Sequence, residues 1–495
     1  MDKLDHRKLS NADIGNVGAA VTVPGYDRQR VTAGIAHIGV GNFHRAHAAL
    51  YVDRCLHLPG QEAWGICGIG LGNSEAAVAK AAALRAQDGL YTLTEFAPDG
   101  TTSCRVIGAL VEYLHAPSDP EAVLKKLAHP SIRIVSLTIT EGGYNFDEAS
   151  GAFKLDMPDV AHDLAGGAPR SMFGFIVEAL RRRRVAGHLA FTVVSCDNLR
   201  QNGDTARRAI LAFADALDAD LARWIGDHVA FPNSMVDRIV PTVTDAVRAR
   251  VADLTGIDDA SPVVGEAFTQ WVIEDRFSDG RPRFAEAGVE LRDDVEAYEA
   301  VKGRMLNASH MLMSYPSLLL GYRFVHDAMK DPDIVALLTR FLASDVEPLI
   351  DPPAGISLQA YREKIIERFS NPEIGDQLLR VAHDGASKLP VFHTKTITQL
   401  AERDGDMRRE ALLLACFQRY LRGVDDSGVA FDVNEVKLTE QDWALANCED
   451  PAAVMRMSPF SGLRLDRHRS FIESFRSIWS CLEAHGCREA LRKVL

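Results

Sequence analysis

The sequence lacks any hydrophobic run long enough to cross a membrane. Apolar stretches such as residues 132–139 and 311–320 fall far short of the roughly 20 residues that a membrane-spanning helix requires. Residues 1–21 mix charged and polar side chains and contain no apolar core ahead of a small-residue cleavage site, so they do not resemble a signal peptide. We therefore expect a protein without a membrane partner that works in the cytoplasm.

Cysteine is scarce, and its spacing argues against a C-x-x-C pair and against a cysteine-bound metal. The eight cysteines are scattered and form no C-x-x-C pair, which is typical of a reducing compartment. The short pairs His44-x-x-His47 and Cys481-x5-Cys487 have no cluster of further ligands beside them, and the zinc pattern H-E-x-x-H is missing. We therefore expect no metal site.

Positive charge is in deficit. The chain has 55 Lys and Arg residues against 68 Asp and Glu residues, a formal net charge of -13, which excludes the basic footprint of a nucleic-acid partner. The sequence also has no P-loop and no G-x-S-x-G elbow. These absences argue against ATP hydrolysis and serine hydrolase chemistry.

The composition is that of an ordinary globular protein of 495 residues, 47% hydrophobic and 25% charged, which predicts two or three domains. In the N-terminal part, strand patterns alternate with helical spacing, which predicts an α/β fold with a Rossmann-type, doubly wound, mainly parallel sheet. The predicted strands are one that begins at residue 33 and ends in glycines, then 64–71, 132–140 and 189–195, with helices over 75–85 and 173–184.

The pattern changes near residue 295. Beyond it, apolar residues recur at helical spacing and few strand patterns intervene, so we expect a mostly α-helical C-terminal domain. The predicted helical segments are 297–320, 333–343, 358–369, 410–421 and 471–495. The sequence therefore predicts two domains, residues 1–294 and 295–495.

The first predicted strand ends in Gly39-x-Gly41. A dinucleotide site needs such glycines, because they let the backbone turn tightly and approach a pyrophosphate. His44 replaces the third glycine of the usual fingerprint, so an ordinary glycine turn remains the alternative.

Glu75 is the candidate carboxylate for the adenosine ribose. It lies beyond the usual spacing of about 20 residues, which predicts a long helix or an insertion before it, and a solvated helix-start glutamate is the alternative.

A second candidate site is the pattern Lys302-x4-Asn307-x2-His310. On an α-helix, Asn307 lies roughly 140° and His310 roughly 80° round from Lys302, so all three project into one hemisphere. A lysine whose pKa is lowered by apolar surroundings can act as a base, while asparagine and histidine can donate hydrogen bonds to an oxygen. The alternative is a solvated lysine and a histidine that only packs.

Longer motifs extend these observations over nearly the whole chain. They are HIGVGNFHRAH (residues 37–47), SLTITEGGY (136–144), SCDNLRQNG (195–203), FPNSMVDRI (231–239), QWVIEDRF (270–277), RFSN (368–371) and DGASKLP (384–390). Together with the Lys302-x4-Asn307-x2-His310 signature, they make the chain similar to the polyol-specific long-chain dehydrogenases, and most similar to their mannitol 2-dehydrogenase branch.

The resemblance implies a zinc-independent mechanism with Lys302 as general acid/base. It implies that Asn198 and Asn307 hold the developing oxyanion, that His310 orients the substrate and that Glu299 lies beside the proton path. The implied polyol-binding positions are Asp237, Arg380 and Lys388, although the last two could be ordinary surface charges. The implied cofactor-binding positions are Gly39, Gly41, Asn42, Phe43, Glu75 and Thr140.

The activity implied by the resemblance is NAD-dependent, reversible oxidation of D-mannitol to D-fructose. Residues 1–294 would bind the dinucleotide, residues 295–495 would bind the substrate and carry the catalytic lysine, and the protein would be a monomer. Oxidation of D-arabinitol and reduction of a hexuronate such as fructuronate are alternatives within the family. A catalytically silent NAD-binding sensor is a more distant alternative.

Two departures from the family pattern bear on these expectations. Ala308 stands where the family commonly has glycine, which requires only a small adjustment of helix packing. After the second predicted strand, Gly72-Asn73-Ser74-Glu75 offers one acidic residue where the family often has two. The glycine and asparagine leave room for the 2′-phosphate of NADP, but no arginine stands nearby to bind it.

Overall fold

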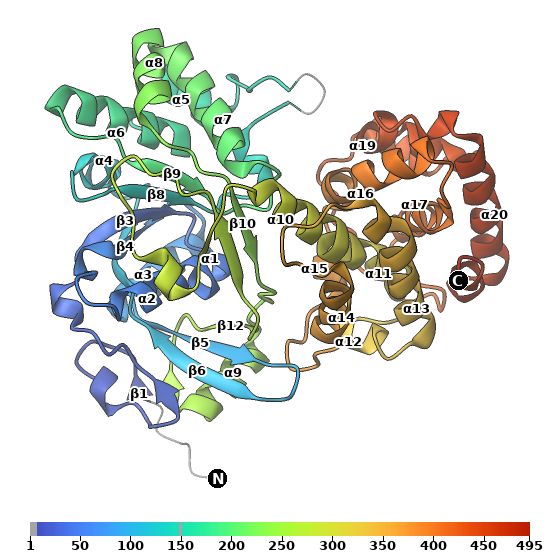
Figure 1. Ribbon diagram of the computed structural model, residues 1–495, viewed down its shortest axis with the longest axis horizontal. Helices are drawn as coiled ribbons and strands as arrows, with labels where there is room; N and C mark the ends of the chain where they lie inside the picture. The colour runs from blue at the N-terminus through green and yellow to red at the C-terminus, as the bar shows by residue number, and fades with distance from the viewer. Residues whose placement is uncertain (1–6, 148–150) are drawn as a thin grey trace. The chain divides into compact units, whose positions relative to one another are not determined.

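The chain divides into two compact units, as a computed structural model shows for residues 7–147 and 151–495 (Figure 1). The first unit ends at Glu296 and the second runs from Ala297 to Leu495. The first combines sheets with helices, and the second is built from helices.

The first unit is organised by a parallel sheet. Its strands stand in the order β7 (Leu110–His115), β4 (Gly65–Gly70), β3 (Ala33–Ile38), β8 (Ile134–Leu137) and β9 (Thr192–Ser195). Strand β3, which comes first in sequence among these five strands, is central and fully buried. It has β4 on one side and β8 on the other. The predicted Rossmann-type doubly wound sheet is therefore confirmed.

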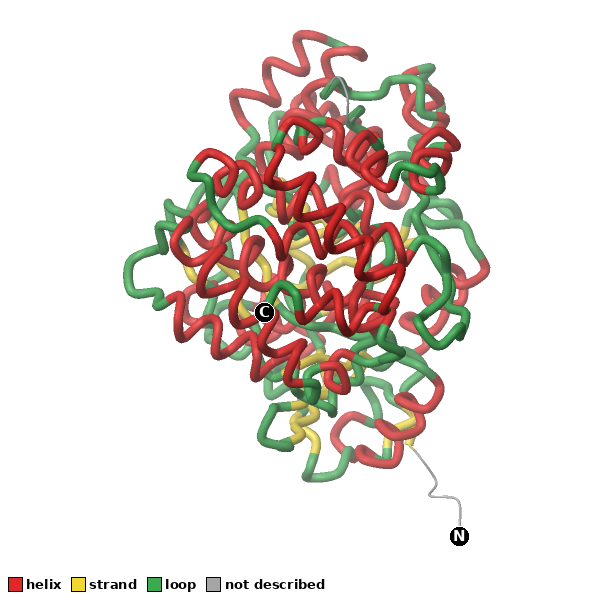
Figure 2. The backbone as a smooth tube through the Cα atoms, turned by 90° about the vertical axis from the view of Figure 1, so that its right-hand side faces the viewer, coloured by secondary structure: helices red, strands yellow, loops and turns green. Residues whose placement is uncertain are grey.

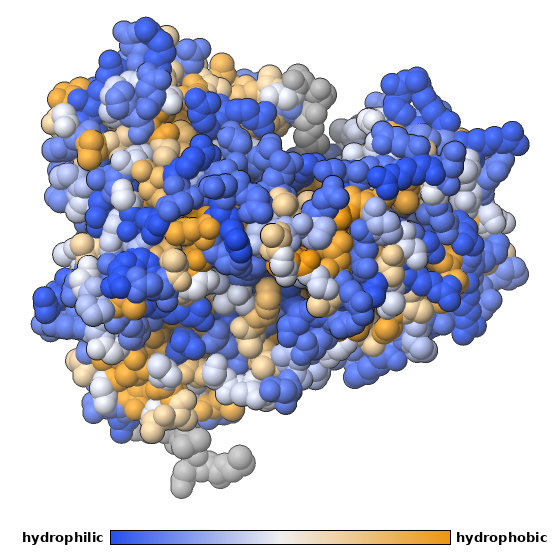
Figure 3. Space-filling model, viewed as in Figure 1, coloured by the Kyte–Doolittle hydropathy of each residue, from blue (hydrophilic) through white to orange (hydrophobic). Residues whose placement is uncertain are grey.

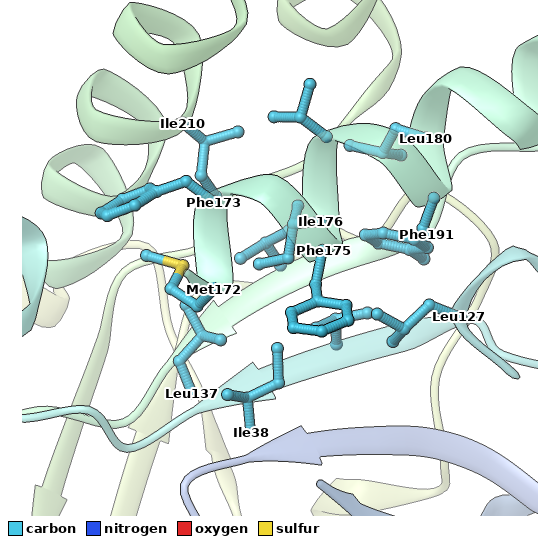
Figure 4. Close-up of a cluster of buried hydrophobic side chains, with 14 of the residues drawn as sticks. Ile38, Leu127, Leu137, Met172, Phe173, Phe175, Ile176, Leu180, Phe191 and Ile210 are labelled. Carbon is cyan, nitrogen blue, oxygen red and sulfur yellow. The ribbon is translucent and has the colours of Figure 1, made fainter. Parts of the chain in front are cut away.

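Alternate residues of the strands enter two different cores, as expected for a pleated sheet. On one face, Ile38 and Leu137 meet helical side chains such as Phe175 and Ile176 (Figure 4). On the other face, Ile35 and Ile134 belong to a second buried cluster. Helices α4 (Pro120–Ala128), α6 (Met172–Ala186) and α7 (Asn202–Leu217) contribute to the first cluster, and α2 (Ala48–Leu56) and α3 (Glu75–Ala86) contribute to the second.

The sequence prediction missed β7 and the two strands directly before it. In the structure, β5 (Tyr91–Phe96) and β6 (Thr102–Ile107) form an antiparallel hairpin within a sheet of order β12 (Val263–Glu266), β5, β6 and β2 (Val21–Thr22). The signal was the alternation Tyr-Thr-Leu-Thr-Glu-Phe. Its polar members are buried because distant residues bind them: Asp259 accepts hydrogen bonds from Thr92, and Arg238 pairs with Glu95.

The first unit contains further short sheets and helices. One sheet has the order β10 (Ser234–Asp237), β13 (Gln270–Ile273) and β14 (Glu290–Leu291), and β1 (Arg7–Lys8) pairs with β11 (Ile257–Asp258). The connection between β3 and β4 is α1 (Asn42–Ala46) followed by α2, broken at His47. The further helices are α5 (Pro158–Leu164), α8 (Ala219–His228) and α9 (Asp245–Thr255).

The second unit is helical (Figure 2). At its centre lies α11 (Ala308–Leu319), which is buried on nearly all sides and contacts α13 (Pro332–Arg340), α15 (Leu378–Ala382), α16 (Gly385–Glu402) and α17 (Arg408–Tyr420). The other elements are α10 (Val295–Val301), η6 (Lys302–Asn307), α12 (Val325–Ala328), η7 (Phe341–Val346), η8 (Glu347–Leu349), α14 (Leu358–Phe369), α18 (Glu440–Ala446), η9 (Pro451–Arg456), α19 (Ser458–Ser461), η10 (Leu465–Arg467), α20 (Arg469–His485) and α21 (Cys487–Arg492).

Hydrophilic residues cover most of the face seen in Figure 3, and hydrophobic residues lie between them in scattered patches. Within the residues that the structure describes, no helix has the length and hydrophobicity needed to cross a membrane.

Candidate active site

The glycine turn at the end of β3 has an open side. Gly39 has φ +95°, and a Cβ atom there would lie 2.0 Å from the carbonyl oxygen of Thr138, so only glycine fits. At Gly41, by contrast, the nearest atom to such a Cβ is 3.8 Å away. The turn follows β3, which has β4 on one side and β8 on the other. Doubly wound sheets bind dinucleotides in the crevice at the carboxyl ends of such strands. These residues fit a dinucleotide pyrophosphate.

A pair of buried histidines supports this turn. His37 hydrogen-bonds Ser136 Oγ at 2.8 Å and Thr138 Oγ1 at 2.9 Å, and its ring stacks on that of His44 with centroids 3.4 Å apart. Burial lowers the pKa of His37 to about 3 and holds the pKa of His44 well below its usual value, so both rings are neutral. His44, which stands in place of the third glycine, therefore packs under the turn, and the sequence analysis had assigned no role to His37.

Asp197 holds the loop that follows β8. Its carboxylate accepts hydrogen bonds from the backbone of Ile139 (3.0 Å) and Thr140 (2.9 Å) and from the hydroxyl of Tyr144 (2.7 Å). Thr140 has φ 64° and ψ 166°, a conformation almost confined to glycine that costs on the order of 1–3 kcal/mol and is concentrated at functional sites. Asn198 follows Asp197 directly and is exposed. The predicted residues Thr140 and Asn198 thus lie at neighbouring strand ends.

Asp237 lies on a different sheet. It ends β10, is 2% exposed and is paired across the strands with Gln270 of β13. Asn202 connects β10 to the central sheet, because its side-chain amide donates to the carbonyl oxygens of Ser195 and Ser234.

The other predicted cofactor positions follow the ends of β3 and β4 in the chain. Glu75 is exposed at the first position of α3, directly after the capping residue Ser74. The side-chain oxygen of Asn42 accepts a hydrogen bond from Arg45 (2.9 Å), and Phe43 stacks on His47. Glu75 follows β4, the neighbour of β3, so it lies at the same edge of the sheet as the glycines.

In the second unit, the segment that carries the predicted lysine is not an α-helix. Lys302–Asn307 forms the π-helical segment η6, between α10 and α11. In a π-helix, residues five apart are hydrogen-bonded neighbours, so Lys302 and Asn307 lie on one face instead of roughly 140° apart. His310 follows Asn307 by three residues on α11 and is its neighbour on the helix surface. The predicted angle was wrong because it assumed α-helical geometry.

This segment is buried and tightly attached. Lys302 is 8% exposed, and Glu299, three residues before it on α10, is partly buried. Arg304 donates hydrogen bonds to the Thr396 hydroxyl of α16 (3.1 Å) and to the carbonyl oxygen of Leu349 (3.0 Å). The π-helical segment therefore lies against α16.

Arg380 is held by Asp376, which the sequence analysis had not identified, and His310 is held by a ring stack. The ring of His310 stacks on Phe369, with centroids 3.9 Å apart. Arg380 of α15 binds both carboxylate oxygens of Asp376 at 2.7 Å. Although burial opposes ionisation, the charges of Arg380 and His310 hold the pKa of Asp376 below its usual value. The guanidinium is thus held in place while its side chain stays 39% exposed.

Lys388 lies at the corner between α15 and α16. Its ammonium group donates to the carbonyl oxygens of His383 (2.6 Å) and Val381 (3.2 Å). Glu435 supports this corner from another segment, accepting hydrogen bonds from the backbone of Gly385 and Ala386, both at 2.9 Å. Burial raises the pKa of Glu435 to about 7, partly offset by these two hydrogen bonds.

The two units thus each contain a candidate cluster. In the first, the glycines, Thr140, Asn198 and Glu75 share the carboxyl edge of one sheet. In the second, η6 and α15 both contact α11, and η6 also contacts α16, so Lys302, His310, Arg380 and Lys388 come from adjoining elements. In the part of the chain that the structure describes, no group of three or more His, Cys, Asp or Glu residues is placed to hold a metal ion.

Comparisons with known proteins match both units. Residues 33–286 match the family model of the mannitol dehydrogenase Rossmann domain, and residues 294–482 match that of the mannitol dehydrogenase C-terminal domain. A polyol:NADP oxidoreductase of Gluconobacter oxydans (strain 621H) is 47% identical to this chain over 458 residues, covering 92% of this chain and 94% of that protein.

Two solved structures are similar over almost the full length. The Pseudomonas fluorescens mannitol 2-dehydrogenase in ternary complex with NAD and D-mannitol has a TM-score of 0.92 at 41% identity, covering 98% of this chain and 99% of that one. A D-sorbitol dehydrogenase in substrate-free form has a TM-score of 0.88 at 44% identity, covering 98% of this chain and all of that one (100%).

Proposed function

Because the chain belongs to the mannitol dehydrogenase family, we propose that it is an NAD-dependent dehydrogenase that reversibly oxidises D-mannitol to D-fructose. The observation that carries this proposal is the π-helical segment, which aligns Lys302 with Asn307 and His310 on one helix face. A base and hydrogen-bond donors aligned in this way suit the removal of a proton from a secondary alcohol.

In the proposed mechanism, Lys302 accepts the hydroxyl proton as the alcohol becomes a ketone. Asn198 and Asn307 donate hydrogen bonds to the developing oxyanion, and His310, fixed by its stack on Phe369, orients the substrate. Glu299 then passes the proton on from Lys302. The remaining polyol hydroxyls are bound by Asp237, Arg380 and Lys388.

NAD, when bound, supplies the acceptor for the hydride that leaves the carbon. The residues that would hold it are Gly39, Gly41, Asn42, Phe43, Thr140 and Glu75, which surround the carboxyl ends of β3, β4 and β8. The open side of Gly41 suits a pyrophosphate, and the carboxylate of Glu75 suits a ribose with free hydroxyls.

NADP is a second candidate cofactor, favoured by two observations. One relative at 47% identity is named as a polyol:NADP oxidoreductase. The segment that precedes Glu75 consists of the exposed residues Gly72, Asn73 and Ser74, none of which would repel a 2′-phosphate. We favour NAD because the described structure places no arginine in this segment to bind that phosphate.

A substrate panel with both cofactors tests the proposal. Purified protein is assayed with D-mannitol, D-sorbitol, D-arabinitol and fructuronate, each with the oxidised or reduced form of NAD and NADP, by the absorbance of the reduced nicotinamide. We expect the highest kcat/KM for mannitol with NAD. A higher value for another substrate would reassign the substrate, and no turnover with any pair would leave the NAD-binding sensor as the better description.

We also propose that the protein is a cytoplasmic monomer. The eight cysteines are free thiols, as suits a reducing compartment. A polyol substrate requires no partner chain.

A further inference from the structure

A cavity of about 240 Å³ lies in the first unit, and none of the proposed cofactor or polyol residues lines it. It is lined by α2 on one side and by β6 and the end of β2 on the other, through Thr22, Val23, Asp53, Arg54, His57, Arg105 and Val106. Its volume is far above the roughly 10–15 Å³ that a single water needs. The cavity can therefore hold a small organic or inorganic ion.

Two arginines that line this cavity, Arg54 and Arg105, have guanidinium N–H groups without a hydrogen-bond partner among the described residues. Arg54 lies over the ring of Tyr51 at 5.3 Å and, among the residues that the structure describes, forms no hydrogen bond and no ion pair. Arg105 uses its Nε to bind Glu95 at 3.1 Å, and its two terminal nitrogens have no partner in the same described set. An unpartnered guanidinium fork is a strong hydrogen-bond donor to an anion.

The polar groups around the arginines are already engaged. Asp53 accepts hydrogen bonds from Tyr26 (2.6 Å) and from the backbone of Gly108 (2.9 Å), and burial raises its pKa. His57 accepts a hydrogen bond from the backbone of Gly25 through Nε2, so its Nδ1 donates to the carbonyl oxygen of Asp53.

Cationic charge also exceeds anionic charge around Glu95. This carboxylate is shared between Arg105 and the buried Arg238. Burial lowers the pKa of Arg54. The interaction with Tyr51 and the charge of Glu95 offset part of this effect, and repulsion from Arg105 and Arg238 adds to it. A bound anion would relieve this repulsion.

We propose that this cavity is an anion site that binds a phosphate group, with Arg54 and Arg105 as its ligands. Phosphate presents several oxygens to two forked guanidinium groups, whereas a carboxylate presents two. Inorganic phosphate and the phosphate of a small monoester share this chemistry. The site is distinct from the proposed dehydrogenase site, because none of its lining residues is among the proposed catalytic, polyol or cofactor residues.

The test is a calorimetric titration of inorganic phosphate into the NAD-bound protein, at ionic strength held constant with chloride. Bound NAD occupies the phosphate-binding positions of the cofactor site. We expect saturable binding at one site, weakened about tenfold or more in Arg54→Met, because a charge-assisted hydrogen bond is lost. Arg184→Met is the matched control, since it removes an exposed arginine at the end of α6. It should bind as the parent does.

Further arms identify the ligand and keep the test decisive. A sugar monophosphate that binds more tightly than inorganic phosphate would assign the site to phosphate monoesters, and equal or weaker binding would assign it to free phosphate. Circular dichroism checks folding, and Arg105→Met and Arg54→Lys replace Arg54→Met if it does not fold, with weakened binding expected in each. The proposal is overturned if phosphate does not bind, if acetate binds as tightly, or if binding is unchanged in the arginine variants.

Discussion

Lys302, which is buried on the π-helical segment, is the residue on which the proposed chemistry depends. We expect Lys302→Ala to lower kcat for mannitol oxidation by roughly 10²- to 10⁴-fold, the usual contribution of a general acid or base, with little change in NAD affinity. Steady-state kinetics and NAD titration by fluorescence measure the two effects. Lys364→Ala, at an exposed lysine of α14, should keep parental kinetics. Near-normal turnover of Lys302→Ala would exclude it as the base.

Glu75 is expected to select NAD over NADP by electrostatics. Its carboxylate at the start of α3 can accept hydrogen bonds from ribose hydroxyls, whereas a 2′-phosphate would add about two negative charges beside it. Glu75→Gln should therefore raise kcat/KM with NADP relative to NAD, and high salt should partly reproduce the change by screening. The ratio of kcat/KM with NADP to kcat/KM with NAD is measured in the parent and in the variant, at low and at high salt. An unchanged ratio would make Glu75 a solvated helix-start residue.

Glu435 makes stability depend on pH. Its pKa is about 7 in the folded protein and near 4.3 in an unfolded chain, so the folded state binds the proton more tightly. The stability that this proton contributes is complete below about pH 4.3 and is lost as the pH rises through about 7. We expect Glu435→Gln to flatten this part of the decline in the free energy of unfolding, measured with urea between pH 5 and 8.

The matched control for Glu435 is Glu440→Gln, the same chemical change at an exposed position of α18. This variant should keep the parental pH dependence. If the slope were the same in Glu435→Gln and the parent, the buried carboxyl would not be the group that titrates in this window.

At the scale of elements, the corner between α15 and α16 is closely packed. It leaves no room for a side chain at Gly385, the first residue of α16. A Cβ on Gly385 would lie 2.1 Å from the hydroxyl of Tyr315 and 2.9 Å from the ring of Phe417. We expect Gly385→Ala to destabilise the protein by about 1–3 kcal/mol, the usual cost of overpacking, and to raise KM for mannitol by displacing Lys388. Thermal unfolding and steady-state kinetics measure these effects.

Gly462→Ala is the control for this substitution. No atom lies within 4 Å of a Cβ at Gly462, and its φ of -65° suits alanine, so its stability should be unchanged or slightly raised. If Gly385→Ala melted with the parent and kept its KM, the corner would have room to adjust and would not position Lys388.

At the scale of the whole molecule, we expect a monomer because of the net charge. A net charge of -13 opposes self-association. We expect size-exclusion chromatography with light scattering to give the mass of one chain, 54.2 kDa, at micromolar concentration. A mass near twice this value, unchanged on dilution, would show a dimer.

The sequence by itself determined the elements whose apolar periodicity is local. Strands β3 and β4 and helices α3, α6 and α14 lie within a few residues of their predicted ranges, because burial of one face or of a whole strand leaves a pattern in consecutive residues. The motifs also located the glycine turn and the lysine segment.

Tertiary structure decided what depends on residues far apart in the chain. Strand β5 buries Thr92 and Glu95, which Asp259 and Arg238 bind from far along the chain, and such partners leave no periodic signal. Asp197, Asp376 and Glu435 act on loops and helices through hydrogen bonds that sequence spacing does not reveal. The π-helical turn, which aligns Lys302 with Asn307, differs from an α-helix in its i→i+5 hydrogen bonds and its wider turn, and neither leaves a pattern in the spacing of apolar residues.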